Sequence, residues 1–207
     1  MRNMLFPFRN RRALRELGRD KKGATLTEFG LVAPILIMMI MGIFDMAHSQ
    51  YTTALMNGAM QKAGRDLTLE DAGSQQTNID ARVIAQIQNV VPDSATVTLE
   101  KLSHYEFEDI GEAEEFTDTN DDGLCNFGEP YADYNGNGQW DSNRGEVGIG
   151  GARDAVLYTA IVTYDRVFPM YGLAGLPQQV ELRSSTVLRN QPYDEQDIED
   201  IETGNCV

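Results

Sequence analysis

The feature that most constrains this chain is an uncharged, largely apolar run that follows a strongly basic N-terminal segment. The run covers residues 29–44 and reads FGLVAPILIMMIMGIF. A helix rises ~1.5 Å per residue, so the run alone covers only about 24 Å. With its neighbours, residues 24–47 are long enough to cross ~30 Å of hydrocarbon. The pattern therefore predicts a transmembrane helix over residues 24–47, in preference to the buried core helix of a soluble protein.

The charges on either side of this run differ in sign. Residues 1–23 contain eight basic and two acidic residues, whereas the rest of the chain contains nine basic and 30 acidic ones. Basic flanks stay in the cytoplasm, so residues 1–23 form a cytoplasmic leader and the acidic remainder is exported. An exported part with this excess of acidic residues would be repelled by the phosphates of nucleic acids, so we expect no nucleic-acid partner.

A secretory signal peptide also combines a basic start with an apolar run. Such a peptide ends in a small-residue cleavage site. Here the run is followed by Asp-Met-Ala-His-Ser-Gln, which continues as a helix and contains no such site. We therefore expect no cleavage after the run.

The exported part, residues 48–192, has the periodicities of both helices and strands. Apolar residues at helical spacing continue the anchor helix to about Leu69, and their face packs either on the chain's own sheet or on another subunit. A second helix is expected from Ile79 to Val90, with Pro92 just beyond it. Alternating and β-branched residues predict strands at 95–102, 156–167 and 179–188. The fold class is therefore α+β, with a long N-terminal transmembrane helix and a small domain of about three antiparallel strands.

Residues 118–146 stand apart, because they contain the spacing of an EF-hand calcium loop, D-x-[DN]-x-[DN]-G-x5-E. In that pattern alternate side-chain oxygens and one carbonyl converge on the ion, a glycine makes the sharp turn and a glutamate closes the shell. The ligands predicted for this first loop are Asp118, Asn120, Asp122, the carbonyl of Leu124, Asn126 and the closing Glu129, with Gly123 at the turn.

A second copy of the pattern begins four residues later but is incomplete. Its predicted ligands are Asp133, Asn135, Asn137, the carbonyl of Gln139 and Asp141. Arg144 occupies the position of the closing glutamate, so either Glu146 or Glu129 would have to serve instead. No helices of EF-hand length flank the loops, which indicates dockerin-type loops inserted between strands. We expect structural calcium here; the alternative is a disordered acidic linker.

The two cysteines and the C-terminal end belong to the exported side. Disulfides are stable there, so a bond between Cys125 and Cys206 is an option that their spacing does not decide. Residues 193–207 contain several acidic residues and no basic one, which predicts a mobile tail.

Catalytic motifs are missing from the sequence. It contains no G-x-S-x-G, no HExxH and no phosphate-binding glycine loop. We expect no enzymatic activity.

The residues just before the apolar run resemble a type IV prepilin processing site. Lys21-Lys22-Gly23-Ala24 is followed by Glu28 and Phe29. The resemblance implies that a prepilin peptidase cuts between Gly23 and Ala24 and that the apolar segment stays as the anchor. It also implies a partner for Glu28, the free N-terminal amine of this or a neighbouring subunit. The alternative is a carboxylate that snorkels to the cytoplasmic interface.

The residues that follow Ala24 make the resemblance more specific. Glu28-Phe29-x-Leu31-x-x-Pro34-x-Leu36 with Gly42-Ile43-x-Asp45 resembles the start of TadE-like proteins, minor pseudopilins of tight-adherence (Flp) pilus systems. The resemblance implies a pilin-like exported domain in the periplasm, an anchor in the bacterial inner membrane, and pilins, pseudopilins and pilus assembly machinery as partners. It also allows incorporation into a pilus. The alternative function is an uncleaved, membrane-anchored calcium-binding adhesion or scaffold protein.

Overall fold

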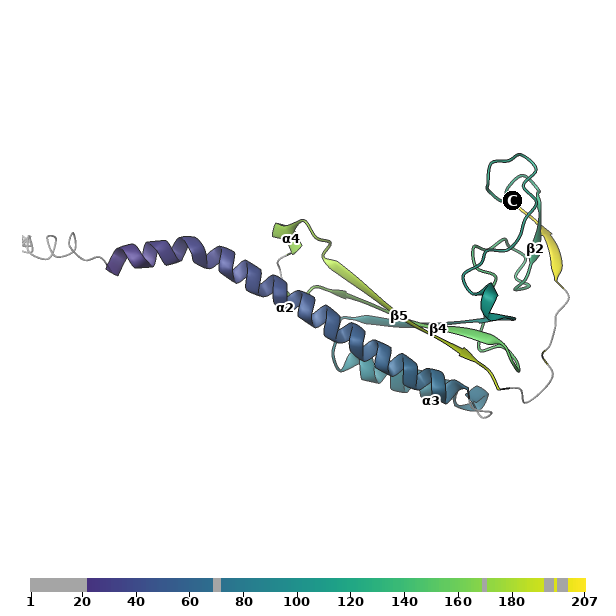
Figure 1. Cartoon of the computed structure of the whole chain (residues 1–207), viewed down its shortest axis with the longest axis horizontal. Coiled ribbons are helices and arrows are strands. Elements are labelled where there is room, and N and C mark those ends of the chain that lie inside the picture. Colours follow the sequence, from purple (N-terminus) through teal and green to yellow (C-terminus); the bar gives the residue numbers. More distant parts are fainter. Residues whose placement is uncertain (1–21, 69–71, 169–170, 192–195, 197–200) are drawn as a thin grey trace, which may run out of the picture.

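The computed structural model describes residues 22–68, 72–168, 171–191, 196 and 201–207. Most of the predicted leader, residues 1–21, lies outside the described residues. One long helix runs the length of the molecule, and a sheet and a second helix pack against its C-terminal half (Figure 1). Loops and short strands gather at the end farthest from the free part of that helix. The predicted α+β class is confirmed.

The long helix α2 spans Lys22–Leu67 and continues through Pro34 without interruption. Its N-terminal half exposes apolar side chains such as Leu31, Ile35 and Ile43, and it is long and apolar enough to cross a membrane. Its C-terminal half buries Met56, Met60 and Leu67, as the predicted stripe requires. The predicted continuation of the anchor helix beyond the apolar run is thus confirmed.

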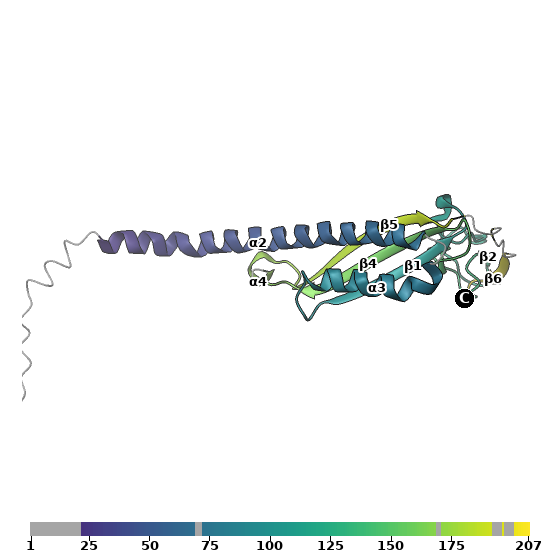
Figure 2. The same ribbon diagram turned by 90° about the horizontal axis from the view of Figure 1, so that it is seen from below.

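The second helix, α3, spans Ala72–Gln88 and lies alongside α2 (Figure 2). It begins seven residues before the predicted start and ends two residues before the predicted end. The early part was missed because residues 72–78 are small or polar and have no apolar periodicity. Val90 lies in the turn after the helix, where its N–H donates to the carbonyl of Ile87 (3.0 Å).

Four antiparallel strands form the main sheet, in the order β3-β1-β4-β5. The predicted strands correspond to β1 (Thr96–His104), β4 (Ala155–Asp165) and β5 (Gln179–Arg189). The edge strand β3 (Glu146–Val147) is too short for its periodicity to be visible in the sequence. Register is set by pairs such as Leu99 with Ala160 and Ala160 with Ser184.

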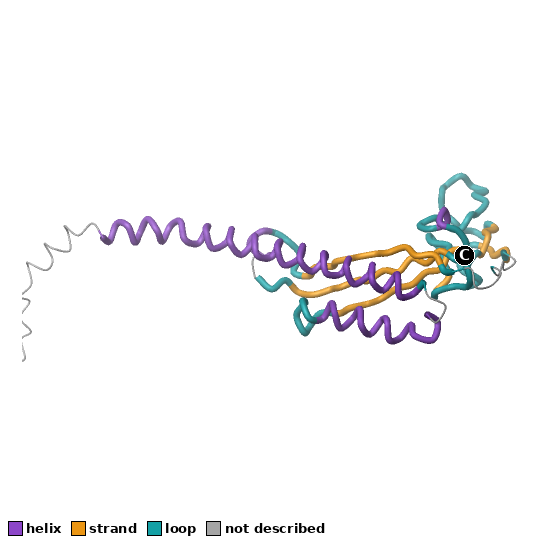
Figure 3. Tube along the Cα trace, turned by 60° about the horizontal axis from the view of Figure 1, so that its bottom comes forward, coloured by secondary structure: helices purple, strands orange, loops and turns teal. Residues whose placement is uncertain are grey.

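Both long helices cover one face of this sheet (Figure 3). The buried core between them draws on α2, α3 and the sheet, and includes Met60, Ile87, Tyr158, Val162 and Leu188. Polar contacts also join the helices to the sheet. The Tyr158 hydroxyl donates to Asp80 (2.6 Å), Lys101 pairs with the same carboxylate (2.5 Å), and the Ser184 hydroxyl donates to Asn57 (2.6 Å). We call the sheet, α3 and α2 from Phe44 onward the body. A short helix, α4 (Tyr171–Ala174), lies in the β4–β5 connection.

Residues 105–145 and 201–207 form a separate cap at the end of the body, which we call the head. It contains the one-turn helix η1 (Phe107–Asp109) and a small sheet of β2 (Pro130–Asp133) with β6 (Glu202–Asn205). The prediction of a mobile tail is therefore wrong for residues 201–207. Strand pairing holds this segment, whereas most of residues 193–200 lie outside the described residues.

Candidate functional site

The residues of the predicted processing site lie in the first turns of α2. Gly23 and Glu28 are exposed, and a side chain added at Gly23 would meet no other atom within 4 Å. Phe29 is exposed as well, at 60%. Ala24 follows Gly23 in the same helical turn. The segment is accessible on all the described sides, as a peptidase substrate has to be.

The first predicted calcium loop has a regular hydrogen-bond pattern. The carboxylate of Asp118 accepts the N–H groups of Asp122 (3.2 Å) and Gly123 (2.8 Å), and Asp122 accepts that of Leu124 (2.8 Å). Gly123 has φ +76°, which glycine adopts without strain. The carboxylate of Glu129 accepts the N–H groups of Thr119 (2.7 Å) and Asn126 (3.1 Å). Glu129 therefore joins the second and ninth positions of the loop.

The second loop repeats this pattern position by position. Asp133 accepts the N–H groups of Asn137 (3.2 Å) and Gly138 (2.8 Å), and Asn137 accepts that of Gln139 (2.8 Å). Gly138 also has φ +76°. The two loops therefore share these hydrogen bonds over their first seven positions, although the second lacks the closing glutamate in its sequence.

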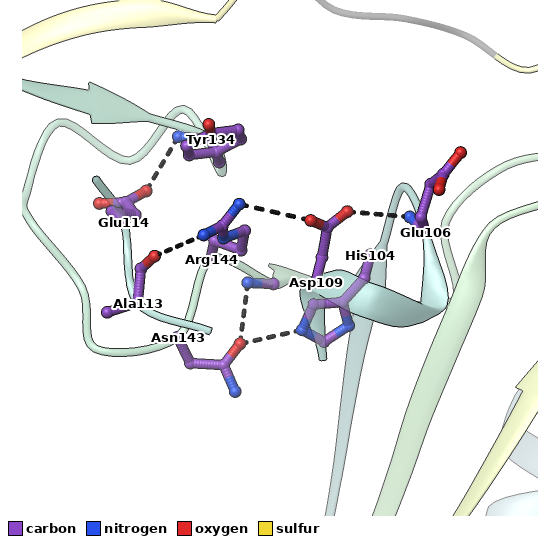
Figure 4. Close-up of polar contacts among 9 residues, drawn as sticks. His104, Glu106, Asp109, Ala113, Glu114, Tyr134, Asn143 and Arg144 are labelled. Atoms are coloured by element: carbon purple, nitrogen blue, oxygen red, sulfur yellow. Dashed lines mark hydrogen bonds and ion pairs between the residues drawn. The ribbon is translucent and has the colours of Figure 1, made fainter. Parts of the chain in front are cut away.

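Glu114 takes the place of the missing glutamate. Its two carboxylate oxygens accept the N–H groups of Tyr134 and Asp141, both at 2.9 Å, which are the second and ninth positions of the second loop. Figure 4 shows Glu114 beside Tyr134. The same pair of positions is joined by Glu129 in the first loop. Glu114 precedes its loop in the sequence, so a search for a contiguous motif does not find it.

The two residues that the sequence offered for this role lie elsewhere. Glu146 is exposed on β3, and the Glu129 carboxylate is bonded within the first loop. Arg144, which replaces the closing glutamate, turns away to pair with Asp109 (3.3 Å) and to donate to the carbonyl of Ala113 (2.9 Å) (Figure 4). In this arrangement neither Glu146 nor the carboxylate of Glu129 joins the second and ninth positions of the second loop, as Glu114 does. The closing ligand of a bound ion stays a prediction.

Backbone pairing explains how Glu114 reaches the second loop. Its segment lies beside β2, where Thr117 N–H donates to the carbonyl of Pro130 (2.9 Å) and Ala132 N–H to that of Glu115 (2.8 Å). At the far end of the loop, Glu114 N–H donates to the carbonyl of Asp141 (3.0 Å), and the Trp140 indole N–H donates to the carbonyl of Glu114 (2.8 Å). Glu114 is thus bonded to the loop through its backbone and its side chain.

The two loops contain the oxygen ligands that calcium prefers, although their acidic side chains do not converge on one point. Among the described residues, no three His, Cys, Asp or Glu side chains lie close enough to hold a metal ion. Six of the eleven predicted ligands are Asn side chains or carbonyl oxygens, however, which calcium accepts readily. Glu114 and Glu129 are 1% and 2% exposed, and neither pairs with a basic residue in the described part of the chain. Buried carboxylates without a countercharge are costly, which is the condition that a bound cation would relieve.

Hydrogen bonds favour the charged form of two of these carboxylates. The side-chain amide of Asn126 and the N–H of Leu124 lower the pKa of Asp122. The N–H groups of Thr119 and Asn126 lower the pKa of Glu129. A carboxylate that ligates a cation has to be ionised, and both effects favour that form.

The cysteines tie the C-terminal end to the first loop. Cys125 and Cys206 form a disulfide with 5.4 Å between their Cα atoms. Around it, Gly128 N–H donates to the carbonyl of Cys206 (2.9 Å), and Cys206 N–H to that of Glu129 (2.8 Å). The first loop and β6 therefore form one covalently closed unit.

Comparison with known proteins identifies the anchor segment. A family model described as TadE-like protein matches residues 23–65, which contain the predicted motif and most of α2. The comparisons with curated proteins and with solved structures find no significant match. The head and the sheet lie outside the matched segment. The likeness to TadE-like proteins therefore lies in the N-terminal helix, at residues 23–65, where the sequence motif predicted it.

Proposed function

We propose that this protein is a minor pseudopilin that supports assembly of a tight-adherence pilus. The observation that carries the proposal is the match of residues 23–65 to the TadE-like family, because it coincides with a single helix that is apolar and exposed in its first half. In this role the protein has no catalytic activity of its own. Its partners are other pilins or pseudopilins and the assembly machinery, which it meets through α2 in the inner membrane with the body on the periplasmic side.

Processing is the first step of this function. A prepilin peptidase removes residues 1–23, and the new N-terminus is Ala24. The accessible glycine at the start of α2 supports this, because cleavage needs a small residue with free space around it. Glu28 then pairs with the free amine of this or a neighbouring subunit, which lowers the cost of a carboxylate in the membrane.

The test is the N-terminal sequence of the protein recovered from its native membranes. We expect Ala24 at the N-terminus, and an uncleaved chain when Gly23→Ala is introduced. Gly30→Ala is the matched control, since Gly30 lies in the same helix with equally open surroundings. An intact leader in the unsubstituted protein would contradict the proposal and favour an uncleaved anchor.

A second proposal concerns the head, which binds two calcium ions that stabilise its loops. The equivalent hydrogen bonds of Glu129 and Glu114 support it, because each carboxylate joins the same two positions of its loop. The first ion is held by the ligands predicted for the first loop. The second is held by Asp133, Asn135, Asn137, Gln139 and Asp141 with Glu114, while calcium supplies the positive charge that the buried carboxylates lack.

Calorimetric titration of the full chain in detergent, after treatment with chelator, tests this proposal. We expect two binding events, with Glu129→Gln removing or weakening one and Glu114→Gln the other. Glu146→Gln is the matched control, because Glu146 is exposed and outside both closing positions. If Glu146→Gln removed the second event and Glu114→Gln did not, the assignment of Glu114 would be overturned.

The two proposals are compatible, but calcium binding also fits the alternative of an uncleaved, membrane-anchored adhesion or scaffold protein. Cleavage distinguishes them. Calcium binding together with an intact leader favours the adhesion or scaffold protein, whereas calcium binding together with Ala24 at the N-terminus favours a pseudopilin with a stabilised head.

A further inference from the structure

The connection between β4 and β5 differs in composition from the rest of the exported part. In a chain with 30 acidic residues after its leader, residues 167–176 contain no charged side chain. Val167 and Leu176 are exposed, at 51% and 49%. Exposed apolar residues in a cluster of this kind mark a surface that contacts another apolar phase or molecule.

This connection lies beside α2 at the point where the helix leaves the body (Figures 1 and 2). The rings of Phe44 and Phe168 are 6.2 Å apart. Next to them, Asp45 and Arg166 form an ion pair, and Arg166 also donates to the carbonyl of Pro177 (3.0 Å). These contacts fix the connection to the helix, and the ion pair neutralises Arg166, the charged residue that directly precedes the connection.

The length of the free part of α2 agrees with this position. Residues 24–43 rise about 30 Å, which is the thickness of the hydrocarbon core of a bilayer. When these residues span the membrane, Phe44 and the β4–β5 connection lie at its outer surface. Phe44 itself is 58% exposed.

A groove of ≈ 570 Å³ is lined by Phe44 and Phe168 together with Tyr51, Val90 and Val167. Among the described residues, its wall contains His48 and Asn89 but no Asp, Glu, Lys or Arg. The apolar surface at this level therefore extends from the helix to the end of α3.

We propose that Phe44, Val167, Phe168 and Leu176 form a foot that rests in the outer interface of the same bilayer that α2 crosses. The occupant of this surface is lipid, because the foot is continuous with the spanning helix and uncharged. The foot limits how deeply the helix enters the membrane and how the body is oriented above it. This inference rests on the proposed membrane anchor.

Fluorescence quenching by brominated lipid tests the foot. The full chain is placed in phosphatidylcholine nanodiscs at one chain per disc, with bromine either high in the acyl chains or near their ends. Trp140 is the only tryptophan and lies in the head, so its emission in the unsubstituted chain is the baseline. We expect Val167→Trp to lose emission mainly to the shallow bromine, and Val147→Trp, which is exposed on β3, to lose none.

Two further variants distinguish a disturbed fold, an incorrect foot and an incorrect membrane anchor. Leu176→Trp repeats the measurement at a second position of the foot, in case Val167→Trp disturbs the fold. Ile35→Trp, in the middle of the span, should lose emission to the deep bromine. Quenching of Ile35→Trp without quenching of either foot variant would overturn the foot and keep the anchor, and would favour a neighbouring subunit as the occupant. No quenching in any variant would overturn the anchor as well.

Discussion

The body and the head are held together by different forces. In the body, α2 and α3 bury an apolar core against one face of a four-stranded sheet, and Ile87 and Val162 are completely buried. In the head, long loops are held by carboxylates that accept backbone N–H groups, by the short β2–β6 ladder and by a disulfide. Apolar packing needs no ion or oxidant, whereas the head depends on both charge and covalent closure.

This difference predicts which reagents should destabilise each region. The body should be insensitive to reductant and chelator, and the head should loosen under either while the body stays folded. The two regions meet at β3, which pairs with the edge of the main sheet at two positions. They also meet where His104 Nε2 hydrogen-bonds Asn143 Oδ1 (2.9 Å) and where the Arg189 guanidinium lies over the Phe107 ring. These contacts are polar or lie near the surface, and we expect the head to open before the apolar core of the body does.

Loss of the disulfide should have the largest effect, and only in the head. The bond joins residues separated by 81 positions, and closing a segment of that length stabilises the folded state by about 4 kcal/mol. Replacing both Cys125 and Cys206 by serine should therefore speed amide hydrogen exchange in β2 and β6 and leave β4 unchanged. Equal loosening of β4 would show that the two regions are one cooperative unit.

Truncation of the core should have the converse effect. Ile87→Ala removes a fully buried side chain from α3 and should lower the free energy of unfolding by about 3 kcal/mol. Urea denaturation followed by circular dichroism measures the loss. Val187→Ala on β5 is the control, since Val187 is 43% exposed and should cost much less. Similar losses in both variants would argue against the packing described for α3.

A smaller effect is expected from the contact between β2 and β6. The Tyr131 ring lies directly over Gly204, so a methyl group at Gly204 would collide with it. Gly204→Ala should cost about 2 kcal/mol of head stability, because the ring has to move. Hydrogen exchange of β6 measures it, with Asn205→Ala on the same strand as the control. Unchanged exchange in Gly204→Ala would mean that the ring has room to shift.

The smallest effect concerns the polar contact within the body. Burial, together with the hydrogen bond to Asp80, raises the pKa of Tyr158 above its ordinary value. A raised pKa stabilises the folded state below the unfolded value of about 10, and this contribution is lost as the pH rises beyond it. Tyr158→Phe should cost about 1 kcal/mol at neutral pH, from the lost hydrogen bond, and should weaken the alkaline destabilisation.

The pH dependence of urea denaturation checks this prediction. Tyr51→Phe is the matched control, because Tyr51 is 58% exposed and lies outside the buried core. An alkaline loss of stability that is the same in Tyr158→Phe as in the unsubstituted chain would show that Tyr158 is not its cause.

The sequence was sufficient to predict the elements that depend on local periodicity of apolar residues. The apolar run and the stripe from Met56 to Leu67 predicted α2, and alternation predicted β1, β4 and β5. It was insufficient where distant segments meet. Glu114 lies well before the second loop, and only backbone pairing beside β2 brings it there. The tail is acidic enough to suggest mobility, yet strand pairing and the Cys125–Cys206 bond hold its end.

The continuity of α2 has a mechanical consequence. At 46 residues the helix is about 70 Å long, and it is a single rod from the anchor along the body to the end of β5, where Gly64 lies against Thr186 and Leu188. Such a rod is a lever. When the helix pivots at Phe44, a change in tilt of about 20°, within the range of spanning helices, moves its far end, about 35 Å away, by about 12 Å. A foot at the membrane surface would be the fulcrum, so the depth and tilt of the anchor set the reach of the head.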